Sequence, residues 1–298
     1  MGAAGTVTLR RLALVTLLIP ILGAGCSSAP VDPAGSVASA GLAAPRLLRG
    51  ADLRLPLDDY VLSPAELGEI AQASRTLVGR CMAGFGLDPL PPPPPGPALR
   101  TWNDWRYGLT DPEAAAQHGY RHDAPQPATP PEPARPTAEQ AAALTGSGTR
   151  TIRGRPVPDG GCLGQADMAL RGPGSAHVDR DLAQRLSAES FRQSRDQPQV
   201  RAAIAGWSQC MARRGYRYPD PFAPVADPRF RPGVPPPSAT EIATAVADVD
   251  CKRQSDLVGI WFAAERSYQQ LSVADHRAEL DRLRQANAAQ LAAARALR

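Results

Sequence analysis

The sequence predicts a mainly α-helical fold made of two duplicated units, each a helix, a proline-rich loop and a second helix. Helix start signals and apolar residues at three- and four-residue spacing recur along the chain, without the strand pattern of βαβ units. Four cysteines also lie in two matching sequence contexts. The chain has 298 residues, of which 32 are proline and 26 are glycine, which limits the apolar material for a core. We therefore expect each unit to be stabilised by a disulfide bond.

The amino terminus has the three parts of a secretory signal peptide. Arg10-Arg11 precedes an apolar run from Leu12 to Leu22, and the small residues Gly23-Ala24-Gly25 follow it. The run is shorter than the roughly 20 residues of a membrane-spanning helix. Cys26 comes next, so this stretch resembles the lipobox of bacterial lipoproteins, in which the cysteine sulfur receives diacylglycerol. The alternative is an ordinary secreted protein with a spare thiol at Cys26.

We expect four segments along the chain: a signal peptide (1–25), a flexible tether (26–50), a first helical repeat unit with proline-rich loops (51–175) and a second helical repeat unit with a long carboxy-terminal helix (176–298). The tether is rich in Ser, Ala, Gly and Pro and has no helical period. Two acyl chains on Cys26 would suffice for stable attachment, since a single chain is only marginal. The expected location is the outer face of the cell membrane.

The charge of the chain excludes some classes of partner. The formal charge is only +4, and the signal peptide contains two of the basic residues. This is too little for electrostatic capture of nucleic acid, so no nucleic-acid partner is expected. Of the 33 basic residues only Lys252 is a lysine. With the excess of Ala, Gly and Pro, we interpret this as a bias of base composition and not as a functional signal.

The four cysteines after Cys26 match in pairs. Cys81 and Cys210 each begin Cys-Met-Ala-x-x-Gly plus a large apolar residue, and Cys162 and Cys251 each begin Cys-x-x-Gln-small-Asp. Two of the four methionines occupy the same place after a cysteine, which indicates an internal duplication. An even number of cysteines in an exported chain predicts two disulfides. The simplest pairing is Cys81–Cys162 and Cys210–Cys251, but three pairings are possible and the sequence does not decide between them.

Zinc binding is the competing use of these cysteines. Their spacing contains no Cys-x-x-Cys pair, and His118 and His122, four residues apart, have no evident third ligand. We therefore expect no metal. The nucleophile elbow, the phosphate-binding loop and the His-Glu-x-x-His motif are also missing, so we expect no cofactor, no catalytic residues and no enzymatic activity.

Start and stop signals define the elements of the first unit. Ser63-Pro64-Ala65-Glu66 predicts a helix from Pro64 to about Phe85, closed by Gly86 in the left-handed conformation. The run Pro91–Pro95 predicts extended polyproline, which we interpret as a rigid spacer in preference to a recognition site. The remaining expected elements are short: helices opening at Thr110 and Thr137, and a strand within 151–157.

The second unit is expected to contain two helices, from Val178 and from Pro198, before the long carboxy-terminal one. Ser238 and Glu241 form a capping box, and almost nothing after it breaks a helix. About 58 helical residues would span roughly 87 Å. From Ser272 onward only a thin leucine seam continues, which predicts either a coiled coil or partner-binding helix, or an exposed solvated helix, with equal weight.

Several motifs together resemble those of a group of uncharacterised actinobacterial secreted lipoproteins. These are the lipobox, the segment 102–109 (Trp-Asn-Asp-Trp-Arg-Tyr-Gly-Leu), the Cys-Met-Ala-x-x-Gly-Tyr context and the stretch from Cys251 to Trp261. The resemblance covers most of the chain from about Ser63. It implies a location in the cell envelope and transfers no activity and no catalytic residues.

The expected function is that of a membrane-anchored extracytoplasmic lipoprotein with a non-catalytic structural or protein-interaction role at the cell envelope. An envelope protein would bind through the carboxy-terminal helix. The alternative is a module that binds envelope polysaccharide or a secreted solute through exposed aromatic rings. Such rings more often belong to a core. The candidates are Trp102, Trp105, Tyr107, Tyr216 and Tyr218.

Overall fold

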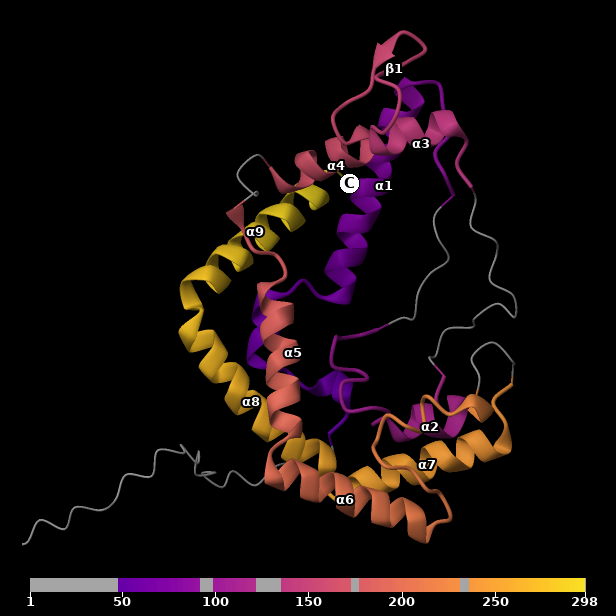
Figure 1. Cartoon of the computed structure of the whole chain (residues 1–298), viewed down its shortest axis with the longest axis vertical. Helices are drawn as coiled ribbons and strands as arrows, with labels where there is room; N and C mark the ends of the chain where they lie inside the picture. Colours follow the sequence, from indigo (N-terminus) through magenta and orange to yellow (C-terminus); the bar gives the residue numbers. More distant parts are fainter. Residues whose placement is uncertain (1–47, 92–98, 122–134, 173–176, 231–235, 298) are drawn as a thin grey trace, which may run out of the picture. The chain divides into compact units, whose positions relative to one another are not determined.

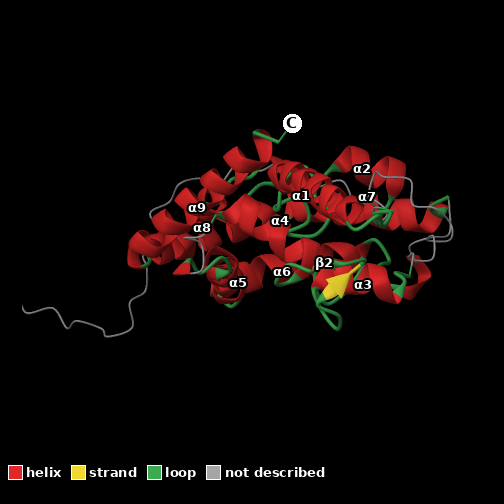
Figure 2. Cartoon of the chain, turned by 90° about the horizontal axis from the view of Figure 1, so that it is seen from above, coloured by secondary structure: helices red, strands yellow, loops and turns green. Residues whose placement is uncertain are grey.

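The computed structural model describes residues 48–91, 99–121, 135–172, 177–230 and 236–297 (Figure 1). Within these ranges the fold is mainly α-helical, as predicted, with one short strand pair, and Figure 2 shows that helices predominate. The helices are α1 (Pro64–Gly84), α2 (Pro112–His118), α3 (Ala138–Thr145), α4 (Gly161–Arg171), α5 (Leu182–Arg195), α6 (Pro198–Arg213), α7 (Ala239–Gln254), α8 (Leu257–Asp275) and α9 (Arg277–Arg295).

Short elements complete the described fold. Three 3₁₀ turns are η1 (Gly50–Asp52), η2 (Pro56–Tyr60) and η4 (Pro228–Phe230). The strand expected within 151–157 is a tight antiparallel hairpin of β1 (Thr151–Ile152) and β2 (Arg155–Pro156).

The helix starts predicted at Ser63, Thr137, Pro198 and Ser238 are confirmed, whereas the helix expected from Val178 begins only at Leu182. In α1 the Ser63 hydroxyl accepts the Glu66 N–H at 3.2 Å, and the Glu66 carboxylate accepts the Ser63 N–H at 2.8 Å, which is a complete capping box. Thr137 caps α3 in the same way. At the start of α7 only half of the predicted capping box forms: the Ser238 hydroxyl accepts the Glu241 N–H at 3.1 Å, but the Glu241 carboxylate accepts hydrogen bonds from Arg121 instead. These caps satisfy backbone donors that the first turn of a helix leaves without a partner.

The helices that end at the two Cys-Met-Ala segments, α1 and α6, have the same carboxy-terminal cap. Leu87 N–H donates to the Met82 carbonyl at 3.1 Å, and Tyr216 N–H donates to the Met211 carbonyl at 3.0 Å. The residue just before each donor, Gly86 or Gly215, adopts a positive φ angle, of 72° and 88° respectively. This pattern is the Schellman motif, in which glycine takes the left-handed conformation without a steric penalty.

The prediction of a single long carboxy-terminal helix is wrong. The segment forms three helices, because the chain leaves the helical path at Asp256, which has a φ of 50°, and again at His276. Figure 1 shows α7 and α8 meeting at an angle. Aspartate tolerates the left-handed conformation better than most side chains, so no glycine or proline marked this break in the sequence.

The apolar seam of α9 lies inside the molecule. Leu280, Leu283 and Leu291 are buried, the first two against η2 and α5 and the third against α1 and α4. A straight helix would have carried these side chains away from the domain. The burial of the seam explains why the chain bends back, and it removes these leucines as a coiled-coil surface.

Packing crosses the boundary that the sequence predicts near residue 175. Helix α1 packs against α9, α2 against α7, and η2 against α8. The described residues from position 48 onward belong to one compact unit in terms of contacts. The boundary between the two repeats therefore stays a prediction. In the structure, elements from both predicted units pack into the same apolar clusters.

Candidate functional site

The lipidation site predicted from the sequence, Cys26, lies outside the described residues. The candidate site therefore consists of the other residues that the sequence singles out: the four cysteines and the segment 102–109. Among the described residues, no helix combines the length and apolar character that crossing a membrane requires.

Both disulfides join the cysteines that the simplest pairing predicted. Cys81 bonds to Cys162 and Cys210 bonds to Cys251, with a Cα–Cα distance of 5.6 Å in each case. The duplicated pattern predicts that the second helix of each copy opens near its cysteine, Cys162 or Cys251. Cys162 does lie in the first turn of α4. Cys251 instead lies in the last turn of α7, so the expectation that a second helix opens at this cysteine is wrong for the second copy. The cause is the break at Asp256, which ends α7 soon after the disulfide.

The segment 102–109 holds distant parts of the chain together. The Trp102 indole N–H donates to the Leu62 carbonyl at 2.8 Å, and the Asn103 amide donates to the Asp58 carboxylate at 2.7 Å. Gly108 has a φ of 74°, and a Cβ there would lie 2.9 Å from Lys252 Nζ. Only glycine fits this close approach without displacing the lysine.

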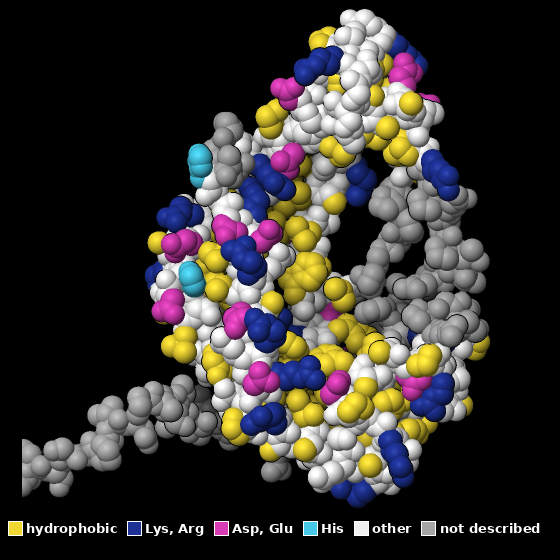
Figure 3. Space-filling view, viewed as in Figure 1, with side chains coloured by type: hydrophobic (Ala, Val, Ile, Leu, Met, Phe, Trp, Pro, Cys, Tyr) yellow, Lys and Arg dark blue, Asp and Glu magenta, His cyan; other side chains and the backbone are white. Residues whose placement is uncertain are grey.

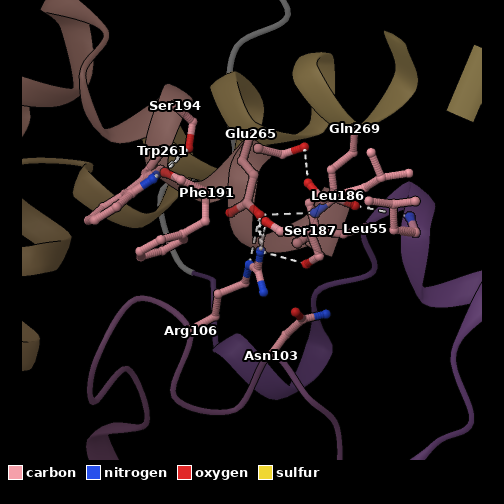
Figure 4. A network of polar contacts seen from close by, with 12 residues as sticks. Leu55, Asn103, Arg106, Leu186, Ser187, Phe191, Ser194, Trp261, Glu265 and Gln269 are labelled. Carbon is pink, nitrogen blue, oxygen red and sulfur yellow. Dashed lines mark hydrogen bonds and ion pairs between the residues drawn. The ribbon is translucent and has the colours of Figure 1, made fainter. Parts of the chain in front are cut away.

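Glu265 on α8 is the centre of the first buried polar network (Figure 4). Its Oε1 accepts the Arg106 Nε–H at 2.8 Å, and its Oε2 accepts the Tyr107 hydroxyl at 2.8 Å. Gln269, one turn later, donates to Oε1 at 2.9 Å and accepts the Leu57 N–H at 3.0 Å. The Glu265 side chain is fully buried, so its charge depends on these donors.

Arg106 extends this network to α5. Its Nη2 donates to the carbonyl and to the hydroxyl of Ser187, at 3.0 and 2.9 Å. The guanidinium also lies over the Phe191 ring, 5.3 Å from its centroid. Burial, and then the charge of Glu265, raises the pKa of the Tyr107 hydroxyl, which therefore stays protonated and donates. The network thus ties segment 102–109 to α5, α8 and η2.

Asp248 and Lys252 on α7 form the second buried polar network. Lys252 Nζ lies 2.9 Å from Asp248 Oδ1 and 3.0 Å from Oδ2, and it donates to the Leu109 carbonyl at 2.9 Å. The Trp207 indole N–H donates to Oδ1 at 2.9 Å. Burial raises the pKa of Asp248, although the charge of Lys252 opposes this shift. Burial likewise lowers the pKa of Lys252, and the charge of Asp248 opposes that shift.

Tyr120 borders the second network. Its hydroxyl is buried and makes no hydrogen bond of normal geometry to any described residue. Burial, and then the nearby charge of Asp248, raises the pKa of this hydroxyl well above its usual value. The phenol is therefore a protonated donor close to the Asp248 carboxyl group.

The aromatic residues proposed as a ligand-binding surface lie mostly inward. Trp102 is exposed, at 41%. Tyr107 is fully buried, and Trp105, Tyr216 and Tyr218 are partly buried against apolar clusters. The structure brings Tyr107, Tyr216 and Tyr218 to one core and does not gather the five rings on one surface.

No metal site is evident among the described residues, where no three His, Cys, Asp or Glu side chains are grouped to hold an ion. His118 lies at the end of α2, and His122 falls outside the described ranges. A shallow open groove follows the turn between α5 and α6, with a mixed lining that includes Arg195, Arg201 and Ile204. On the face drawn in Figure 3, basic and acidic side chains are interspersed.

Sequence reasoning missed the central carboxylates. Glu265 lies one turn after Trp261 on the apolar stripe of its helix, and a charged residue in such a stripe could have signalled a buried ion pair. Asp248 and Lys252 have the spacing of a helical ion pair. No sequence pattern marks Asp248 and Lys252 as buried, because the residues that pack over them include Leu109, which is more than 100 positions away.

Comparisons of the chain with protein-family models, with curated proteins and with solved structures found no match.

Proposed function

We propose that this protein is an exported, lipid-anchored scaffold that acts at the outer face of the cell membrane through a structural or protein-interaction role. The observation that carries the proposal is the pairing of Cys81, Cys162, Cys210 and Cys251 into two disulfides. Structural disulfides form and persist in oxidising compartments. A chain that begins with a signal-peptide pattern and a lipobox-like Cys26 would reach such a compartment.

The buried polar networks support a scaffold role. Glu265, Arg106 and Asp248 use their hydrogen bonds to fix helices and the segment 102–109 to one another. Satisfied buried networks of this kind rigidify a core and specify one arrangement. The resemblance to actinobacterial secreted lipoproteins agrees with the same location at the envelope. A rigid unit joined to the membrane through the tether that the sequence predicts (26–50) would be suited to presenting a surface to a partner away from the membrane.

Membrane attachment can be tested by expressing the chain in a bacterium that processes lipoproteins, and comparing it with Cys26→Ser. We expect the wild type in the detergent phase of a phase-separation assay, and mass analysis of its first peptide should show Cys26 acylated as the amino-terminal residue. The matched variant should partition into the aqueous phase, because it has no thiol to acylate.

Two outcomes of this experiment would contradict the proposal. One is a wild-type chain that keeps residues 1–25 and four free thiols inside the cell. The other is equal detergent partitioning of wild type and Cys26→Ser, which would place the membrane contact elsewhere in the chain.

A further inference from the structure

The Asp248 carboxyl group and the Lys252 amine are in contact in the interior of the protein. They lie four residues apart on α7, where side chains face each other along one side of the helix. The exposed fractions are 0% and 2%. Lys252 Nζ lies within 3.0 Å of both carboxyl oxygens of Asp248, so the amine and the carboxyl group are in direct contact. A bond between this nitrogen and the carboxyl carbon would link two neighbours on one helix face.

Neighbouring groups hold this arrangement. The Leu109 carbonyl accepts one Nζ–H at 2.9 Å and so fixes the nitrogen beside the carboxyl group. The Trp207 indole N–H, at 2.9 Å, marks Oδ1 as the oxygen that stays, because it would stabilise negative charge there. The buried Tyr120 hydroxyl is a second donor close to the same carboxyl group. Burial raises the pKa of Asp248 and lowers the pKa of Lys252, which favours the neutral acid and the free amine.

We propose that Asp248 and Lys252 condense to an amide, an isopeptide bond within α7. A proton first passes from the Lys252 ammonium to Oδ2, and the Nζ lone pair then forms a bond to Cγ. The negative charge that develops on Oδ1 is held by the Trp207 N–H. A second proton moves from Nζ to Oδ2, the Cγ–Oδ2 bond breaks, and Oδ2 leaves as water. One amide and one water replace the ammonium and the carboxylate, without an oxidant or a cofactor.

The surroundings favour the condensed product. A partly enclosed cavity of about 20 Å³ lies beside Lys252, lined among others by Thr110, Asp256 and Gly259. This volume accommodates one water molecule, so the released water has a place to go. Condensation also removes two charges from a site where the burial of ions is unfavourable. A neutral amide keeps an N–H for the Leu109 carbonyl and an oxygen for Trp207.

The identity of residue 252 fits this chemistry. Lys252 is the only lysine among the 33 basic residues of the chain, and every other one is arginine. Composition bias explains the arginines but not the one exception, which is buried against a carboxyl group. A guanidinium stays protonated and does not act as a nucleophile, whereas a buried amine can lose its proton. The chain therefore has its single primary side-chain amine at the one place where this reaction needs it.

Mass analysis of the purified mature protein tests the bond directly. After reduction, alkylation and denaturation, a tryptic digest should yield a peptide that contains both residues, ends at Arg253 and is lighter than its sequence by one water. A lysine-specific protease should leave the denatured chain uncut, because its only site is Lys252. The Asp248→Asn variant should lose ammonia in place of water, which distinguishes amide formation from other dehydrations.

Lys252→Arg is the matched control, since it keeps a cation and cannot condense. Its peptides should have the full mass of their sequence. A wild-type peptide of full mass, together with complete cleavage after Lys252, would overturn the proposal. Because these two measurements are made on wild-type protein, a folding defect in a variant does not change their outcome. A negative result for the isopeptide bond would not count against the proposed membrane anchor at Cys26, since acylation is measured on a different peptide.

Discussion

Glu265 fixes three parts of the chain through one carboxylate. It accepts hydrogen bonds from Arg106 and Tyr107 of the segment 102–109, and from Gln269, which in turn holds the backbone of Leu57. Such a buried charge is stable only while its donors remain, and its donors depend on it in the same way. The segment 102–109, which the resemblance marked out, thus has a structural reason to contain Arg106 and Tyr107.

Glu265→Ala should strongly destabilise the protein. The change leaves the Arg106 guanidinium buried without its counter-charge, which typically costs about 3–5 kcal/mol of unfolding free energy. Urea denaturation followed by circular dichroism measures this loss. Glu279→Ala is the control, because its ion pair with Arg282 is exposed, with side-chain exposures of 50% and 61%, and should contribute less than about 1 kcal/mol. Equal losses in the two variants would contradict the role of Glu265.

At the scale of helices, the two copies are most alike where α1 and α6 end. Both ends have the same pair of backbone hydrogen bonds around a glycine with positive φ, followed by a buried or partly buried apolar residue, Leu87 or Tyr216. The sequence predicted both caps because the requirement is local. The copies diverge after their second cysteines, where α4 continues and α7 stops near Asp256.

Gly215→Ala should lower the unfolding free energy by about 1–2 kcal/mol, the cost of placing an L-residue in the left-handed conformation. A Cβ at this glycine would meet nothing within 4 Å, so the loss reports backbone conformation alone. Gly79→Ala, in the middle of α1 and also without neighbours, should instead stabilise by about 0.5–1 kcal/mol. Thermal melts of the two variants should therefore move in opposite directions, and a shift in the same direction would refute the cap assignment.

The leucines of α9 can be tested against a partner-binding role. Leu283 is buried at 1% exposure, so Leu283→Ala should cost about 2–5 kcal/mol, whereas Leu271→Ala, at 56% exposure, should change stability by less than about 0.5 kcal/mol. Urea denaturation and size-exclusion chromatography measure the two effects. Dissociation of an oligomer by Leu283→Ala with unchanged monomer stability would show that the seam serves a partner after all.

Truncation is a poor test of the carboxy-terminal region for the same reason. Removing everything after Leu271 would delete α9 and expose the apolar clusters that it covers on α1, α4 and α5. An envelope partner that uses this region would have to contact the outward faces of α8 and α9. Substitutions at exposed positions such as Leu271 therefore probe partner binding without removing core residues.

For the molecule as a whole, the two disulfides link elements that are far apart in the sequence but share a core. Cys81–Cys162 joins α1 to α4 over 81 positions, and Cys210–Cys251 joins α6 to α7 over 41 positions. The apolar core is divided into several clusters, and each is built from several elements. Covalent links between these elements compensate for limited apolar burial in a proline-rich chain.

The double variant Cys210→Ala/Cys251→Ala should lose roughly 4 kcal/mol of stability, from the loop that the disulfide closes in the unfolded chain. Urea denaturation of the variant and of the reduced wild type gives two measurements of this effect. Both proteins should have a lower unfolding free energy than the oxidised wild type, because both lack the Cys210–Cys251 bond. The reduced wild type should lose more stability, because reduction also opens Cys81–Cys162. A variant as stable as the oxidised wild type would show that this disulfide contributes nothing to the fold.

The sequence by itself determined what depends on neighbouring residues: the capping boxes, the glycine caps, the helical class and the two matching cysteine contexts. Only the tertiary structure decided between the cysteine pairings, bent the carboxy-terminal segment at Asp256 and His276, and buried the leucines of α9. It also placed Glu265, Asp248 and Lys252 inside the protein. The physical reason is distance along the chain, since a cap is satisfied within a few residues, whereas Glu265 and Lys252 depend on hydrogen-bond partners more than 100 positions away.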